Sequence, residues 1–180
     1  MKILIVASNG KVRSLVAQEA LNRNLDITSL GKWDNKNHNI KYIQKDELNL
    51  TADDLNNFDI IVDATGRWTP ESISNITNVM IHLANILENI NKRLIVVGVG
   101  SLFVDKEKNN NWYGKNFPES WRPLSKAHDD GLNYLRQKNN LNWTYISPDC
   151  NFIADGKRTG EYKLGEEKLN LLNILLENHI

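Results

Sequence analysis

The sequence predicts an α/β fold in which helices cover both faces of a largely parallel, doubly wound sheet. Three apolar runs rich in β-branched residues end in small residues, at 2–7, 58–66 and 92–101. Such runs are typical of strands that are buried on both faces of a parallel sheet. Segments with apolar residues three and four positions apart, the period of an amphipathic helix, follow these runs. Strands that alternate with helices in this way indicate an α/β architecture.

The first 21 residues read as a strand, a tight polar turn and a helix. The strand covers residues 2–6, the turn residues 7–13, and the helix carries Val12, Leu15, Val16, Ala17 and Ala20 on its predicted inner face. A dinucleotide-binding βαβ unit begins in this way. Unpaired N–H groups at the helix start, with about half a positive charge from the helix dipole, attract a pyrophosphate. A strand, turn and helix that bind nothing would have the same outline.

The glycine pattern of this turn is incomplete. The spacing G-x-x-G-x-x-G would place glycines at positions 7, 10 and 13, which here hold Ala7, Gly10 and Arg13. Gly10 keeps a close approach of backbone to phosphate, whereas Ala7 adds a methyl group to the turn. Arg13 either reaches a phosphate as a charged donor or blocks the site. The residues expected to contact the cofactor here are Ala7, Asn9, Gly10, Lys11, Val12 and Arg13.

The second strand is predicted at residues 26–30, and its end bears on the choice of cofactor. An acidic residue at this point would bind the ribose hydroxyls of NAD. Gly31 and Lys32 follow instead, and no acid occurs before Asp34. Lys32 therefore favours the 2′-phosphate of NADP(H), unless it is a solvated loop lysine. A third strand is predicted at 41–45, and Thr51 then resembles a helix N-cap.

Two further strands end in residues that suit a ligand. The strand within 58–66 runs into Ala64, Thr65 and Gly66, and the strand within 92–101 runs into Gly98. In open α/β sheets ligands lie outside the carboxyl ends of the strands, and small residues let a ring lie against the backbone. We expect these four residues to line the cofactor. Arg67 and Trp68 follow as candidate phosphate or ring contacts, and Ser101 either hydrogen-bonds a substrate carbonyl or caps a turn.

The remaining segments complete the predicted order of elements. A helix is expected from Pro70 to Ile90, a loop over the strand ends at 105–115, a helix from Leu124 and a sixth strand within 141–148. Residues 164–180 are expected to close the chain as an amphipathic helix or a strand–helix pair.

Composition excludes several classes of function. The 22 basic and 22 acidic residues balance, so no overall field attracts nucleic acid or acidic membranes. The one cysteine, Cys150, excludes an intramolecular disulfide and fits a reducing compartment. A core strand at the very start leaves no room for a signal peptide, and no apolar run approaches the ~18–20 residues of a membrane span. We expect one cytoplasmic domain over residues 1–180 and no metal site.

Residues 2–12, 58–66, 93–104 and 143–148 together resemble the atypical short-chain dehydrogenase/reductase superfamily. The branch is that of the NAD(P)H-binding, NADH-flavin-reductase-like and NmrA-like proteins. The resemblance implies a Rossmann-like fold. It also implies that the first turn binds the cofactor pyrophosphate and that the fourth and fifth strand ends flank the ribose and nicotinamide.

The chain departs from that family at the catalytic Tyr-x-x-x-Lys pair and near its end. The positions expected for the pair hold Leu124 and His128, and the matching pattern at Tyr134–Lys138 lies too late in the helix. Tyr134 is therefore interpreted as a packing residue. His128 is either a proton donor or a surface-helix histidine. The substrate side, about 150–180, is short for the family, so the pocket is either shallow or completed by a second subunit in a homodimer.

These departures favour chemistry that needs little acid–base machinery. Hydride transfer to a flavin or quinone fits, because the acceptor ring itself carries the chemistry. We expect an NADP(H)-preferring oxidoreductase of flavin- or quinone-reductase type, although NAD(H) also fits the turn, and Ser101 and His128 are the catalytic candidates. The alternative is a non-catalytic redox sensor that binds a dinucleotide and acts through a protein partner.

Overall fold

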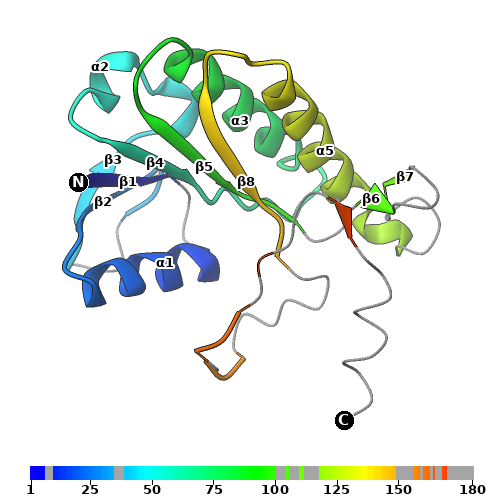
Figure 1. The fold of residues 1–180 in the computed structure, drawn as a ribbon, viewed down its shortest axis with the longest axis horizontal. Helices are drawn as coiled ribbons and strands as arrows, with labels where there is room; N and C mark the ends of the chain where they lie inside the picture. Colours follow the sequence, from blue (N-terminus) through cyan, green and yellow to red (C-terminus); the bar gives the residue numbers. More distant parts are fainter. Residues whose placement is uncertain are drawn as a thin grey trace.

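Six parallel strands form the main sheet, in the order β3-β2-β1-β4-β5-β8 (Figure 1). The computed structural model describes residues 1–6, 10–34, 39–99, 104–105, 110–111, 118–148, 156–158, 160–162, 164 and 168–169. The strands are β1 (Lys2–Val6), β2 (Asp26–Gly31), β3 (Lys41–Gln44), β4 (Ile60–Asp63), β5 (Arg93–Val97) and β8 (Asn142–Ile146). Each matches a predicted strand, and the order confirms the doubly wound α/β fold.

The strand order changes direction at β1. From β1 the chain builds outward through β2 and β3 on one side, then returns to add β4, β5 and β8 on the other. The register is parallel throughout, with Val6 opposite Leu30 on β2 and opposite Asp63 on β4. The switch point therefore lies between the carboxyl ends of β1 and β4, which is where open α/β sheets bind ligands.

Helices lie on both faces of this sheet (Figure 1). The helix α1 (Lys11–Asn22) covers one face, and α3 (Ser74–Leu87) and α5 (Arg122–Arg136) pack against each other on the other face. Three shorter helical elements are also present: η1 (Glu47–Asn49), α2 (Ala52–Leu55) and η3 (Glu119–Trp121).

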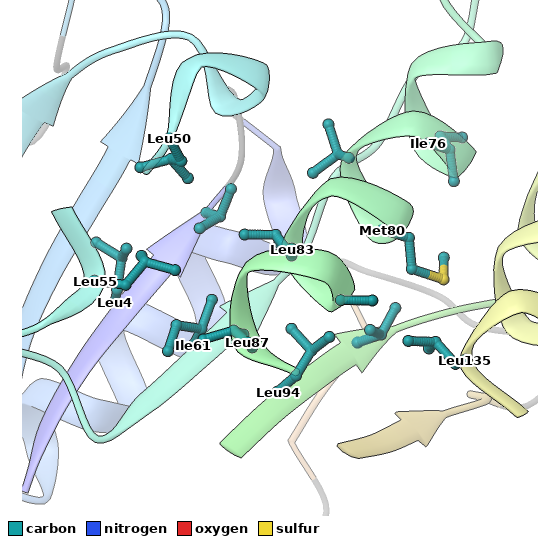
Figure 2. Close-up of a cluster of buried hydrophobic side chains, with 14 of the residues drawn as sticks. Leu4, Leu50, Leu55, Ile61, Ile76, Met80, Leu83, Leu87, Leu94 and Leu135 are labelled. Carbon is teal, nitrogen blue, oxygen red and sulfur yellow. The ribbon is translucent and has the colours of Figure 1, made fainter. Parts of the chain in front are cut away.

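Two hydrophobic clusters, one on each face of the sheet, form the core. Alternate strand residues divide between them because successive side chains point to opposite faces of a sheet. Leu4 and Ile61 belong to the larger cluster with α3 and α5, whereas Ile3 and Ile5 belong to the smaller cluster with α1. Figure 2 shows the larger cluster, with leucines of α3 packed on Leu4, Ile61 and Leu94.

The inward face of α1 differs from the predicted one. Leu15 is 52% exposed, whereas Arg13, Ala17 and Ala20 are buried. The spacing of four and then three residues places these three side chains on one face of the helix. The predicted inward positions of Ala17 and Ala20 are confirmed, and Val16 packs against the same cluster. The prediction that Leu15 faces inward was wrong, and Arg13 takes a place on the buried face.

The first residues of α2 and α3 are determined by local hydrogen bonds more than by the apolar pattern. Thr51 caps α2 in a capping box with Asp54, as its N-cap pattern predicted. The helix expected from Pro70 begins only at Ser74, because Ser72 and Ile73 donate backbone hydrogen bonds to the carbonyl of Thr69 and form a turn first.

A second, smaller sheet joins distant parts of the chain. It consists of β6 (Val104–Asp105), β7 (Asn110–Asn111) and β9 (Lys168–Leu169), in the order β7-β6-β9. The prediction of a plain loop at 105–115 is corrected by the strand pairs at Asp105 and 110–111. Residues 170–180, Ser101 and Cys150 lie outside the described residues. No helix in the described part of the chain combines the length and apolar character that crossing a membrane requires.

Candidate functional site

The carboxyl ends of β1 and β4 bring two predicted binding segments together. The backbone N–H of Ala64 donates to the carbonyl of Val6 at 2.9 Å, which joins the segment after β4 to the end of β1. Gly10 then caps α1 with an extended backbone, and the first turn of the helix contains no acidic residue. The positive end of this helix therefore carries no carboxylate in its own first turn, an arrangement suited to an anion.

Arg13 occupies the place of the third motif glycine and is buried, with 6% of its surface exposed. Its guanidinium is hydrogen-bonded to the hydroxyl of Tyr42 on β3 and opposes the rise in the pKa of Tyr42 that burial causes. The Tyr42 hydroxyl in turn lies against the carbonyls of Gly31, at 2.9 Å, and Trp33. These contacts hold the charge of Arg13 at the end of β2, where the adenosine ribose of a dinucleotide lies in this type of sheet.

Lys32 lies at the same strand end and has partners of its own. Its Nζ is 3.2 Å from a carboxylate oxygen of Asp46 and 5.7 Å from the centre of the Trp33 ring. Asp46 also accepts a hydrogen bond from the backbone N–H of Leu48, and this bond and Lys32 lower its pKa. Lys32 is half-exposed, so the pair is open to solvent.

Asp63 ends β4 with a buried carboxyl group. It lies two residues after Ile61 and therefore points to the same face of the sheet, toward α3. Burial raises the pKa of Asp63 to about 6, although its oxygen accepts a hydrogen bond of 2.9 Å from the N–H of Thr65. The Thr65 hydroxyl is buried without a hydrogen bond of regular geometry, but it lies near enough to Asp63 to lower that pKa.

The buried carboxylate of Glu47 turns Arg67 inward. Their side chains are 3% and 16% exposed and approach to 3.3 Å, and Arg67 also donates to the carbonyl of Gly66 at 3.1 Å. Trp68, the next residue, is 74% exposed. Its indole nitrogen would lie 3.7 Å from a Cβ atom placed on Gly66, which is ordinary van der Waals contact, and Gly66 itself remains exposed.

Gly98 is in direct contact with Tyr145 of the neighbouring strand β8. A Cβ atom at position 98 would lie 2.1 Å from the Tyr145 ring, so only glycine fits beneath that ring. The Tyr145 hydroxyl is 3.0 Å from Nδ1 of His128 on α5. Burial lowers the pKa of His128 to about 4 and raises that of Tyr145, so both groups are uncharged at neutral pH.

His128 is 4% exposed, and the interpretation as a surface-helix histidine was wrong. Leu124 and Leu132, four residues before and after it, also face the core, and this spacing could have indicated an inward side chain. Tyr145 lies two residues after Trp143 on the same face, so its position was open to prediction although its role was not. Sequence reasoning also missed Tyr42 and Glu47, which lie on short elements with no motif.

The predicted site residues divide into three groups. Gly10 to Arg13, Ala64 to Gly66, and Gly98 lie at the carboxyl edge of three neighbouring strands. His128 joins Gly98 through Tyr145, whereas Lys32 follows β2 on the other side of β1. Ala7, Asn9 and Ser101 lie outside the described residues. Within the described part of the chain, histidine, cysteine, aspartate and glutamate form no cluster that could hold a metal ion.

Comparison with known proteins places this geometry in a family. The chain is 34% identical to SP1627 of Streptococcus pneumoniae TIGR4, "a putative NADH-flavin reductase", over 100% of its own length and 95% of that protein, with a TM-score of 0.88. It is 30% identical to the uncharacterized protein YwnB of Bacillus subtilis over 173 residues, which is 94% of this chain and 81% of YwnB. The chain belongs to the atypical short-chain dehydrogenase/reductase superfamily, in its NADH-flavin-reductase-like branch. No family model matches it.

The fold of this reductase-like chain extends to more distant members of the superfamily. A short-chain dehydrogenase/reductase superfamily protein from Agrobacterium tumefaciens, solved with bound NAD, has 11% identity and a TM-score of 0.63 over 82% of this chain and 48% of that one.

Tyr134, which matches the tyrosine of the family's catalytic pattern in sequence only, packs against the core and donates to Asn85 at 2.5 Å.

Proposed function

We propose that the protein is an NAD(P)H-dependent oxidoreductase of the flavin- or quinone-reductase type, with a flavin as the electron acceptor. The observation that carries the proposal is the edge at the switch point, where the start of α1 lies beside the small residues 64–66. Membership of the branch, and the NADH-flavin-reductase name given to SP1627, support it.

The proposal gives each predicted residue a role. Ala7, Asn9, Gly10, Lys11 and Val12 hold the pyrophosphate at the start of α1, where backbone N–H groups lack partners within the helix. Ala64, Thr65, Gly66 and Gly98 form the surface on which the cofactor rings lie. The bound nicotinamide supplies the hydride.

Ser101 and His128 complete the proposed site on the substrate side. Ser101 follows β5 and donates a hydrogen bond to the acceptor ring. His128 is neutral at physiological pH because burial holds its pKa near 4, and it fixes the Tyr145 hydroxyl beneath the end of β5. In this role His128 orients the end of β5 through the uncharged His128–Tyr145 hydrogen bond. This fits a flavin acceptor, because the flavin ring takes up the hydride without a charged acid from the protein.

A preference for NADP(H) is the finer part of the proposal. Arg13 reaches the end of β2 through its bond to Tyr42, and Lys32 follows the same strand. A guanidinium is a strong partner for a phosphate group because it offers several donors in a fixed plane. The two cations together favour a 2′-phosphate on the adenosine ribose.

The test is turnover by the purified protein. Oxidation of NADPH is followed by its absorbance at saturating FMN and, separately, with a soluble quinone, under anaerobic conditions. An enzyme consumes NADPH in proportion to the acceptor added. A sensor, the alternative function, binds NADPH with a measurable dissociation constant and leaves its absorbance unchanged with either acceptor.

The proposal treats the chain as one cytoplasmic NAD(P)-binding domain with a small-molecule acceptor as its partner. A homodimer, in which a second copy completes the substrate side, is part of the same proposal, and nucleic acid, membrane and metal have no role in it. Sedimentation velocity with and without NADPH measures the oligomeric state.

A further inference from the structure

Exposed tryptophans gather at the same edge of the sheet as the proposed site. Trp33, Trp68 and Trp121 are 61%, 74% and 53% exposed, and they follow β2, follow β4 and precede α5. All three positions are at the carboxyl edge, because α5 runs back from that edge to the start of β8 (Figure 1). Trp143, the other described tryptophan, packs against the core. An exposed aromatic ring at such an edge offers a flat apolar face against which a ligand ring can stack.

Trp68 is the member of this group that the structure ties to the binding surface. The inward ion pair of Arg67 with Glu47 fixes the chain immediately before Trp68, while the Trp68 side chain itself is exposed. The chain after it is fixed by the hydroxyl of Ser72, which donates to the carbonyl of Thr69 at 3.1 Å. Between these two fixed points the indole nitrogen lies within van der Waals distance of the space beside the Gly66 backbone, and most of the ring is open to solvent.

We propose that Trp68 is a stacking platform for a planar heteroaromatic ring that lies against the backbone of residues 64–66. The ring is either the adenine of the dinucleotide or the isoalloxazine of the flavin, since both present the same flat, polarisable face to an indole. This inference rests on the proposed function, and it assigns to Trp68 the recognition of the ring itself.

The test compares Trp68→Ala and Trp68→Phe with the wild-type protein. Tyr162→Ala, which removes an exposed aromatic side chain outside this group, serves as the control. Dissociation constants are measured by calorimetry for AMP and NADPH as adenine probes and for FMN and riboflavin as flavin probes. Trp68→Ala should weaken one pair of probes by roughly ten- to a hundredfold, the effect of losing one stacking aromatic. Trp68→Phe should stay within about threefold of wild type, because a phenyl ring still stacks.

The pattern of losses identifies the ring and separates this inference from the proposed function. Loss of AMP and NADPH binding assigns the adenine, and loss of FMN and riboflavin binding with NADPH unchanged assigns the isoalloxazine. If the wild type binds and turns over these ligands while Trp68→Ala binds them all equally well, the platform is overturned and the enzyme stands. If Trp68→Ala loses ring binding in a protein that shows no turnover, the platform stands and the reductase is overturned. A wild type that binds no probe overturns both.

Discussion

Arg13, a buried arginine in place of a motif glycine, is the residue on which the proposed preference for NADP(H) depends. The sequence alone left open whether Arg13 reaches a phosphate or blocks the turn. In the structure its guanidinium interacts with the hydroxyl of Tyr42, which in turn donates to the carbonyl of Gly31 at the end of β2. Arg13 can therefore meet the adenosine half of a dinucleotide while the start of α1 keeps its capacity for the pyrophosphate.

Replacement of Arg13 by alanine should change the preference more than the overall capacity for binding. We expect the dissociation constant for NADPH to rise roughly ten- to a hundredfold, since a hydrogen bond to a charged group contributes about 1.5–3 kcal/mol. The constant for NADH should change by less than about threefold. Arg23→Ala is the matched control, because Arg23 lies at the other end of α1 and pairs with Glu19 at 2.6 Å. Equal loss for both cofactors would show that Arg13 supports the fold of the turn and does not select the phosphate.

The raised pKa of the buried Asp63 carboxyl group predicts that the stability of the protein depends on pH. Its folded-state pKa is about 6, above its ordinary value, so the folded state binds a proton more tightly than the unfolded state does. This contribution to stability is complete below about pH 4 and is lost as the pH rises through 6. Asp63→Asn removes the ionisation and keeps an oxygen that can accept from Thr65.

Urea unfolding of both proteins at pH 4.5 and pH 7.5 measures this contribution. Between pH 4.5 and pH 7.5 the wild type should lose about 2 kcal/mol of its free energy of unfolding that Asp63→Asn does not lose. The magnitude follows from the raised pKa, since one pK unit corresponds to about 1.4 kcal/mol. Parallel profiles for the two proteins would mean that the Asp63 carboxyl is ionised in the folded protein without cost.

At the scale of elements, strands were easier to predict than helix faces. Every strand of the main sheet was predicted, and for β1, β4 and β5 the reason is that a continuous apolar run leaves few other choices. The face of α1 was predicted in part: Ala17 and Ala20 are buried as expected, but Leu15 is more apolar than Ala17 and yet lies outside. Where α1 packs closely on the sheet, small alanines fit and a leucine does not. Apolar periodicity in the sequence does not report how closely a helix packs on its sheet. Glu47 was missed for a related reason, since it lies in a single 3-10 turn.

The contact between β5 and β8 provides a test at this scale. Gly98→Ala places a methyl group 2.1 Å from the Tyr145 ring, so the ring must move and its hydroxyl must leave His128. We expect a loss of about 1–3 kcal/mol in the free energy of unfolding, the usual result of overpacking. In the Tyr145→Ala background the space is open, and the same glycine substitution should cost less than about 1 kcal/mol. A loss of equal size in both backgrounds would mean that the backbone at 98, and not the ring, requires glycine.

At the scale of the whole molecule, topology determines which residues can cooperate. The order β3-β2-β1-β4-β5-β8 brings Gly10, the segment 64–66 and Gly98 to one edge from positions almost ninety residues apart. The sequence predicted this edge because parallel strands all end on the same side. It did not predict the groups beneath the edge, Asp63 with its raised pKa and the Tyr145–His128 pair, because their properties come from burial and from contacts between distant elements.

If this edge binds a dinucleotide, the whole domain should become more stable in its presence. A ligand at about 100 times its dissociation constant adds about 2.7 kcal/mol to the free energy of unfolding. For a chain of this length that corresponds to roughly 5–11 °C in the melting temperature. A thermal-shift series with NADPH, NADP, NADH and FMN should show this shift with NADPH and a smaller one with NADH at the same concentration. For Arg13→Ala the shift with NADPH should no longer exceed the shift with NADH. Absence of a shift with every dinucleotide would mean that Ala7 and Arg13 have closed the turn, and that the sheet edge serves another ligand.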